Sequence, residues 1–104
     1  MQASTSINVS GFFIGKNSSQ VIGLTVGTSP VVIDVLGDLG RVSRAAQLIN
    51  SGLGAAQIEL DFGDGYGDSF PLNSGEALVS VDDPIKTVRI TWLGVDATLR
   101  WVAR

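Results

Sequence analysis

The sequence predicts an all-β domain, an antiparallel β-sandwich or jelly-roll-like fold of about seven to eight short strands. Apolar and polar residues alternate with period two in several runs, as in strands with one buried and one solvated face. The 13 Gly and 3 Pro separate these runs at intervals of about eight to twelve residues, which is typical of a sandwich or barrel. The intervals are too short for crossover helices, so a parallel α/β sheet is disfavoured.

The expected strands are defined by their alternating apolar residues. Ile58, Leu60 and Phe62 form one set, Val88, Ile90 and Trp92 a second, and Leu99, Trp101 and Ala103 a third. Ile22, Leu24 and Val26 form a fourth set, and Val31, Ile33 and Val35 a fifth. Residues 70–81 predict two short strands that are broken at the turn tripeptide Asn73-Ser74-Gly75, and roughly Ile7 to Ile14 predict one more strand.

Residues 41–50 carry two patterns. Val42, Ala45, Ala46 and Ile49 have helical spacing, which gives a short helix as the alternative. We predict a strand in which Ala46 and Leu48 face inward, because the all-β pattern around it needs another strand. Residues 50–54, Asn-Ser-Gly-Leu-Gly, then predict a loose hairpin into the next strand.

The length and composition predict one domain over residues 1–104, with residues 1–6 as a flexible N-terminal arm. The chain has no Cys and no His, which excludes disulfides, thiolate chemistry and the Ser-His-Asp and Cys-His nucleophile systems. We therefore expect no enzyme and no cofactor. The net charge of −3 disfavours nucleic acid and membrane surfaces as partners.

The most conspicuous motif is the acidic glycine loop from Asp61 to Asp68, Asp-Phe-Gly-Asp-Gly-Tyr-Gly-Asp. We interpret it as a hairpin turn whose Asp-Gly steps adopt positive φ. Carboxylates at 61, 64 and 68 leave calcium binding as an alternative, although Gly63 stands where an EF-hand loop needs an oxygen ligand. We expect no metal here.

The candidate site residues are interface residues. Phe12 and Phe13 are adjacent, so on a strand they point in opposite directions, and one of them faces solvent or a neighbouring subunit. Arg100 and Arg104 share one strand face, where they can meet acidic residues of another chain. Asp64 and Tyr66 of the acidic loop complete the set. By alternation, Trp92 and Trp101 belong to the core.

From about Arg41 to its end, the chain resembles small structural proteins of tailed-bacteriophage virions. The segments that carry the resemblance are Leu48-Ile-Asn-Ser-Gly52, Ile58-Glu-Leu-Asp-Phe-Gly-Asp-Gly65, Phe70-Pro-Leu-Asn-Ser-Gly-Glu76, Val88-Arg-Ile-Thr-Trp92 and Leu99-Arg-Trp101. These segments combine turns and strands, and the resemblance implies a compact β-sandwich with no catalytic residues.

The resemblance implies a decoration, or cement, protein that bridges major capsid subunits and stabilises the capsid. Its expected partners are the major capsid protein or another virion protein, with further copies of itself in a homo-oligomer such as a trimer. It is expected to be made in the host cytoplasm and to end on the capsid surface. The alternative is a carbohydrate- or receptor-binding β-module of a phage tail or fibre, which needs an exposed aromatic platform.

Overall fold

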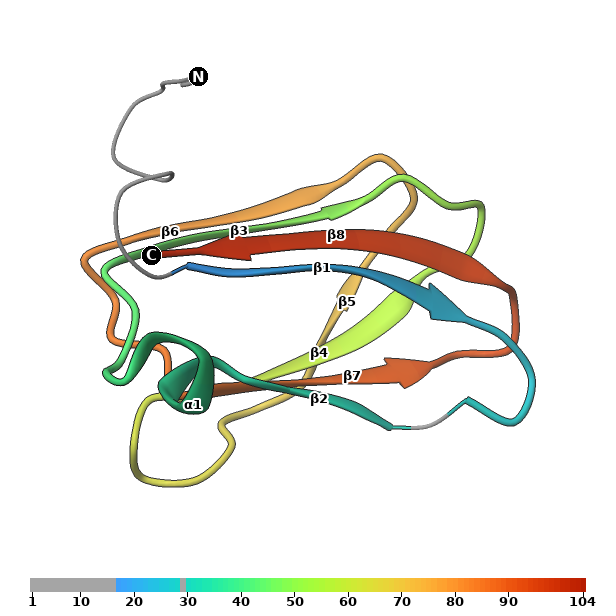
Figure 1. Ribbon diagram of the computed structural model, residues 1–104. Helices are drawn as coiled ribbons and strands as arrows, with labels where there is room; N and C mark the ends of the chain where they lie inside the picture. The colour runs from blue at the N-terminus through green and yellow to red at the C-terminus, as the bar shows by residue number, and fades with distance from the viewer. Residues whose placement is uncertain (1–16, 29) are drawn as a thin grey trace, which may run out of the picture.

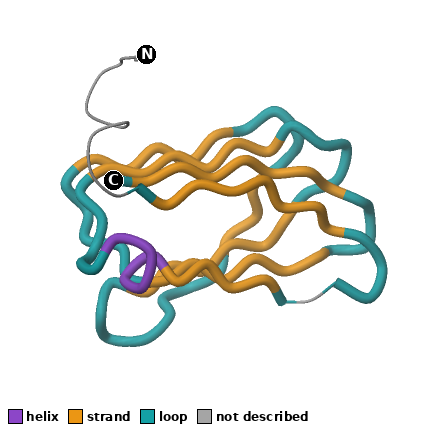
Figure 2. Tube along the Cα trace, in the orientation of Figure 1, coloured by secondary structure: helices purple, strands orange, loops and turns teal. Residues whose placement is uncertain are grey.

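The computed structural model describes residues 17–28 and 30–104, which form two stacked antiparallel sheets with one short helix at one end (Figure 1, Figure 2). The strands are β1 (Ser18–Leu24), β2 (Val31–Asp34), β3 (Ala45–Asn50), β4 (Ala56–Asp61), β5 (Phe70–Leu72), β6 (Ala77–Val81), β7 (Thr87–Trp92) and β8 (Ala97–Ala103). The helix is α1 (Val35–Leu39). The described residues contain no helix that is long and apolar enough to cross a membrane.

The strand order is that of a jelly roll. The first sheet has the order β1-β8-β3-β6 and the second sheet the order β2-β7-β4-β5. Strand β1 pairs with β8, β2 with β7, β3 with β6 and β4 with β5, all antiparallel. This is the pairing of one long hairpin rolled into two sheets. The predicted all-β fold is therefore confirmed.

The apolar residues that the alternation assigned to an inner face fill the space between the sheets. The buried set contains Ile22, Leu24, Ile33, Val35, Leu39, Ala46, Leu48, Ala56, Ile58, Leu72, Ile85, Val88, Ile90, Ala97, Leu99, Trp101 and Ala103. Residues 45–50 form strand β3 with Ala46 and Leu48 inward, as predicted. The helical alternative for residues 41–50 is wrong, because the helix lies earlier in the chain.

In three of the predicted apolar sets, the last residue lies beyond the end of the observed strand. Val26 and Phe62 are exposed, because β1 ends at Leu24 and β4 ends at Asp61, and the chain turns directly after each. Val35 is buried, but as the first residue of α1. Asp34 caps this helix by accepting a hydrogen bond from the Gly37 amide at 2.9 Å.

The predicted hairpin at residues 50–54 is wrong. Strands β3 and β4, which this segment joins, belong to different sheets, so the segment crosses from one layer of the sandwich to the other. Asn73-Ser74-Gly75 likewise joins β5 of the second sheet to β6 of the first. The hairpin predicted for the acidic loop is confirmed, because β4 pairs with β5 across it.

The first strand is linked to the helix through the core. The Trp101 indole Nε1 donates to Ser18 Oγ at 3.0 Å, and Ser18 Oγ donates to Asp38 Oδ2 at 2.6 Å. Trp101 lies on β8, Ser18 on β1 and Asp38 on α1, so this chain of hydrogen bonds connects three elements. The start of β1, a strand at the end of its sheet, is thereby held in place.

Candidate interaction surface

The outer faces of the two sheets differ in chemistry. The outer face of the first sheet carries Ser19, Val21, Gly23, Ala45, Gln47, Ile49, Ala77, Val79, Val81, Thr98, Arg100 and Val102. Arg100 is the one charged residue in this set. The outer face of the second sheet carries Val32, Asp34, Gln57, Glu59, Asp61, Pro71, Thr87, Arg89 and Thr91. This second set contains four charged residues.

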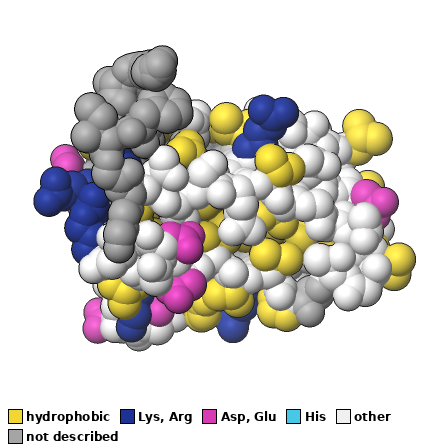
Figure 3. Space-filling view, in the orientation of Figure 1, with side chains coloured by type: hydrophobic (Ala, Val, Ile, Leu, Met, Phe, Trp, Pro, Cys, Tyr) yellow, Lys and Arg dark blue, Asp and Glu magenta, His cyan; other side chains and the backbone are white. Residues whose placement is uncertain are grey.

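Valine side chains are unusually open on the outer face of the first sheet. Val21, Val79 and Val81 are 68%, 64% and 67% exposed. The sandwich needs none of them for its core, since the inward positions of the same strands already fill it. In Figure 3, which has the orientation of Figure 1, this face is seen edge-on along the top of the molecule, where hydrophobic side chains and a Lys or Arg side chain reach the surface. Apolar surface of this kind is a common feature of protein-binding faces.

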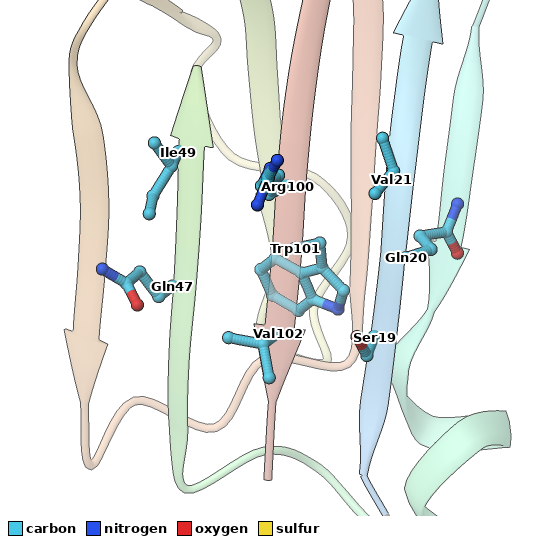
Figure 4. A pocket seen from close by; sticks show the side chains of 8 residues that line it. All are labelled: Ser19, Gln20, Val21, Gln47, Ile49, Arg100, Trp101 and Val102. Atoms are coloured by element: carbon cyan, nitrogen blue, oxygen red, sulfur yellow. The ribbon is translucent and has the colours of Figure 1, made fainter. Parts of the chain in front are cut away.

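Arg100 lies in the middle of this face. It stands on β8, with Val21 of β1 opposite it on one side and Ile49 of β3 on the other (Figure 4). Arg100 is exposed and has no hydrogen-bond or ion-pair partner among the described residues. A shallow groove of about 350 Å³ runs past it along β1, β8 and β3, and a second of about 210 Å³ lies between β3 and β6.

The charges on the outer face of the second sheet are satisfied within the chain. Arg89 holds Glu59 with two hydrogen bonds, from Nε to Oε1 at 2.8 Å and from Nη2 to Oε2 at 3.0 Å. The Arg89 guanidinium also lies 4.2 Å from the centre of the Tyr66 ring. Such a bidentate pair stacked on an aromatic ring is a rigid local structure. It leaves little charge for a partner to recognise.

The Arg89 guanidinium holds the pKa of the Glu59 carboxyl below its ordinary value, chiefly by hydrogen bonding. Because the pKa of Glu59 is lower in the folded state than in the unfolded state, this pair stabilises the fold at pH values above the unfolded-state pKa of Glu. The contribution is lost as the pH falls through the lowered folded-state value. We expect the Glu59 carboxyl, followed by NMR titration, to titrate below an ordinary Glu, and Arg89→Gln to return its midpoint upward. An unchanged midpoint in Arg89→Gln contradicts this account.

The acidic loop is organised around its first carboxylate. Asp61 Oδ1 accepts from the Gly63 amide at 2.7 Å and from the Gly65 amide at 3.1 Å. The Gly63 hydrogen bond is the main cause that lowers the pKa of Asp61. Gly63 and Gly65 both have positive φ, as the predicted turn requires. No group of three or more acidic side chains with metal-binding geometry occurs in residues 17–28 and 30–104.

The structure separates the candidate interface residues. Arg100 projects from the outer face of the first sheet, and Arg104 is the first residue after β8. Asp64 is exposed in the acidic loop, and Tyr66 lies beneath Arg89 on the second sheet, so neither shares a surface with Arg100. Phe12 and Phe13 lie outside the described residues, as do the arm at residues 1–6 and the strand expected at residues 7–14.

Sequence reasoning missed the valines of the outer face. Val21, Val79 and Val81 occupy the polar phase of their strands, where the alternation predicts solvated residues. That mismatch was the available signal, because an apolar residue in the outward phase needs another partner. The two tryptophans follow the prediction more closely: Trp101 is buried and Trp92 is partly buried against the core.

Comparisons with protein families, with curated proteins and with solved structures find no match to this chain.

Proposed function

We propose that this domain is a structural binding module that docks the outer face of its first sheet onto another protein. In the form that the sequence resemblance implies, it is a decoration protein that bridges major capsid subunits on the virion surface. The observation that carries the proposal is the valine-rich, almost uncharged outer face of the first sheet, with Arg100 at its centre and no partner for Arg100 among the described residues.

The chemistry of this face defines the partner surface that fits it. Exposed valines on β1 and β6 provide apolar contact on both sides of Arg100. A complementary partner therefore offers apolar side chains around one carboxylate. Arginine in the centre of an apolar patch is a frequent binding hot spot, because surrounding contacts exclude water from its ion pair. The carboxylate sets the orientation, and the apolar area supplies most of the affinity.

The role is mechanical, and the proposal includes no catalytic step. A domain that touches two capsid subunits raises the free energy needed to separate them. Self-association of the domain, for example as a trimer, multiplies these contacts, since each bound copy raises the effective concentration of the next. Moderate individual contacts then give durable attachment.

The decisive variants alter the outer face of the first sheet. Arg100→Glu brings a negative charge toward the partner's carboxylate, and Val79→Lys places a charge in an apolar contact. We expect each variant to weaken binding about tenfold or more. Binding is measured by co-sedimentation with undecorated shells of the major capsid protein encoded by the same genome.

Matched controls change charge in the same way elsewhere. Arg41→Glu lies in the segment after α1, and Val95→Lys lies in the exposed turn between β7 and β8. Both controls are expected to bind like the unaltered chain, with all variants checked for folding by thermal unfolding. The proposal fails if the unaltered chain does not sediment with the shells, or if the controls lose binding as much as Arg100→Glu does.

A further inference from the structure

Strand β6 forms an unprotected edge of the first sheet. It lies next to β3 at the end of the sheet, and no strand of residues 17–28 and 30–104 pairs with its other side (Figure 1). Its sequence is Ala-Leu-Val-Ser-Val, without charge or proline. Natural sheets usually protect their edges with charged residues or proline, because the free backbone groups of an edge accept further strands. β6 carries neither kind of residue.

The two edges of the second sheet show the contrast. Strand β5 is three residues long and contains Pro71, and β2 is four residues long and follows Pro30. Proline cannot donate a backbone hydrogen bond, so it blocks the addition of a strand at these positions. β6 is longer than either and lies within a continuous stretch of described residues.

The backbone hydrogen bonds at both ends of β6 fix the phase of its ladder with β3. The Asn50 amide donates to the Glu76 carbonyl at 3.0 Å, and the Asp82 amide donates to the Arg44 carbonyl at 2.7 Å. Both pairs join even-numbered residues, and hydrogen-bonded pairs alternate along an antiparallel ladder. The even-numbered residues of β6 therefore bond to β3.

The odd-numbered residues of β6 face the open edge. Leu78 and Ser80 bond to β3, opposite Leu48 and Ala46 in the register. The backbone N–H and C=O groups between them point the other way. The residues that present these groups to the edge are Ala77, Val79 and Val81.

The side chains next to this edge are apolar and partly open. Val79 and Val81 are 64% and 67% exposed on the outer face, beside the groove of about 210 Å³ between β3 and β6. Leu78 points to the inner side and packs against the core, but it is only partly buried. A strand added to β6 would cover all three side chains, and the burial of their apolar surface favours its binding.

Acidic residues stand at both ends of β6. Glu76 precedes the strand, Asp82 and Asp83 follow it, and all three are exposed. None of the three forms an ion pair with a described residue. The one basic residue that the ladder with β3 places beside them is Arg44, opposite Asp82, so the ends of this edge carry net negative charge.

We propose that the edge of β6 binds an extended segment of a partner protein as an added antiparallel strand, and that this segment has an apolar, β-branched centre with a basic residue on each side. Backbone hydrogen bonds to Ala77, Val79 and Val81 hold the segment in the sheet. Its apolar side chains pack beside the two valines, and its basic residues lie opposite Glu76 and Asp82.

The same charges argue against a second copy of this chain as the occupant. The self-pairing that uses all three edge residues centres on Val79 and places Glu76 of each copy opposite Asp82 of the other. Like charges directly opposite each other destabilise a strand pair. A basic segment replaces this repulsion with attraction. The inference concerns the edge of β6 and does not depend on what the outer face binds.

The probe is the synthetic peptide acetyl-Lys-Arg-Val-Thr-Val-Thr-Val-Arg-Lys-amide, which has the proposed charge pattern. We expect it to bind the full chain with a Kd on the order of 0.1 mM, measured by NMR titration. The amides of Ala77, Val79 and Val81 are expected to exchange with solvent faster than those of Leu78 and Ser80 in the free chain. At saturating peptide they are expected to slow at least about fivefold.

Two N-methylated peptides separate strand pairing from simple electrostatic attraction, because they keep the charge of the probe. In the proposed ladder the peptide valines lie opposite the edge-facing residues of β6 and bond to them, whereas the peptide threonines bond to nothing on β6. N-methylation of the three valines is expected to weaken binding at least about tenfold, and N-methylation of the two threonines to change it by less than about threefold.

A proline variant tests the same edge from the side of the protein. Because the Val79 amide faces the edge, Val79→Pro removes an edge donor without removing a hydrogen bond to β3. It is expected to fold, as checked by thermal unfolding, and to bind the probe at least about tenfold more weakly. Val79→Thr keeps the amide and the β-branched shape and is expected to bind within about threefold of the unaltered chain.

Three results would overturn the proposal. The first is a probe that does not bind, and the second is a valine-methylated peptide that binds as well as the probe does. The third is slow exchange of the Val79 amide in the free chain, which means that the edge is already paired; if this protection rises with protein concentration, the occupant is a second copy. The methylated peptides decide the question with the unaltered chain even if Val79→Pro does not fold.

Discussion

The Asn50→Asp variant is expected to lose about 4 kcal/mol of folding stability at neutral pH, a large part of the roughly 5–15 kcal/mol of a small domain. Asn50 is fully buried where the chain crosses from the first sheet to the second. Its Nδ2 donates to the carbonyls of Gly54 at 2.8 Å and Leu72 at 2.9 Å, and its Oδ1 accepts from the Gly52 amide at 3.0 Å. Aspartate keeps the shape of the side chain but replaces the donating Nδ2 with a carboxylate oxygen, which can only accept and therefore faces two carbonyl oxygens without a hydrogen bond.

The loss has a predictable pH dependence. Burial and the two facing carbonyls raise the pKa of an aspartate at position 50 above its unfolded-state value of about 3.9. The folded state then binds the proton more tightly than the unfolded state, so the stability of the variant falls as the pH rises above that value. Acidification toward pH 4 therefore recovers part of the loss relative to the unaltered chain.

Urea unfolding at pH 7 and at pH 4, followed by tryptophan fluorescence, measures both effects. Gln20→Glu is the matched control, because it makes the same change from amide to acid at an exposed position of β1. It is expected to shift stability by less than about 0.5 kcal/mol. An Asn50→Asp chain as stable as this control would mean that the side chain of Asn50 does not hold the two layers together.

The interior of each strand follows from the sequence, but its ends do not. Alternation identifies Ile58, Val88 and Leu99 as core residues because burial on one face imposes period two. The same pattern continues through Phe62, which is 47% exposed, because the backbone leaves the ladder one residue earlier. Local hydrophobicity carries no information about the residue at which hydrogen bonding to a neighbouring strand stops.

The candidate surface shows a second limit of sequence analysis, because the local pattern does not indicate which strands pair with each other. Strands β3 and β4 are neighbours in the sequence but lie in different sheets. The turn residues between them predict a hairpin, whereas the segment crosses from one sheet to the other. For the same reason, Arg100 and Tyr66 could be grouped as interface residues, whereas the roll places them on opposite sheets. Contacts between strands far apart in the sequence decide which side chains share a face.

The glycines of the crossing segment give the second large effect. We expect Gly54→Ala to destabilise the fold by about 3 kcal/mol, because the added methyl group overlaps backbone that cannot rotate away. A Cβ at this position would overlap the Val95 carbonyl oxygen and would lie 2.7 Å from the Val95 carbonyl carbon and 2.8 Å from the Asp96 oxygen. The Gly54 amide also donates to the Asp96 carbonyl at 2.9 Å, so the two backbones are held together at this point.

Gly23→Ala is the matched control for this substitution. A Cβ at Gly23 meets nothing within 4 Å, and its φ lies outside the left-handed region. There alanine reduces the freedom of the unfolded chain and is expected to leave stability unchanged or to raise it by up to about 1 kcal/mol. Thermal unfolding of both variants separates the two causes: if Gly54→Ala behaves like Gly23→Ala, the crossing segment has room to move away from the β7–β8 turn, and close backbone contact is not what requires glycine at position 54.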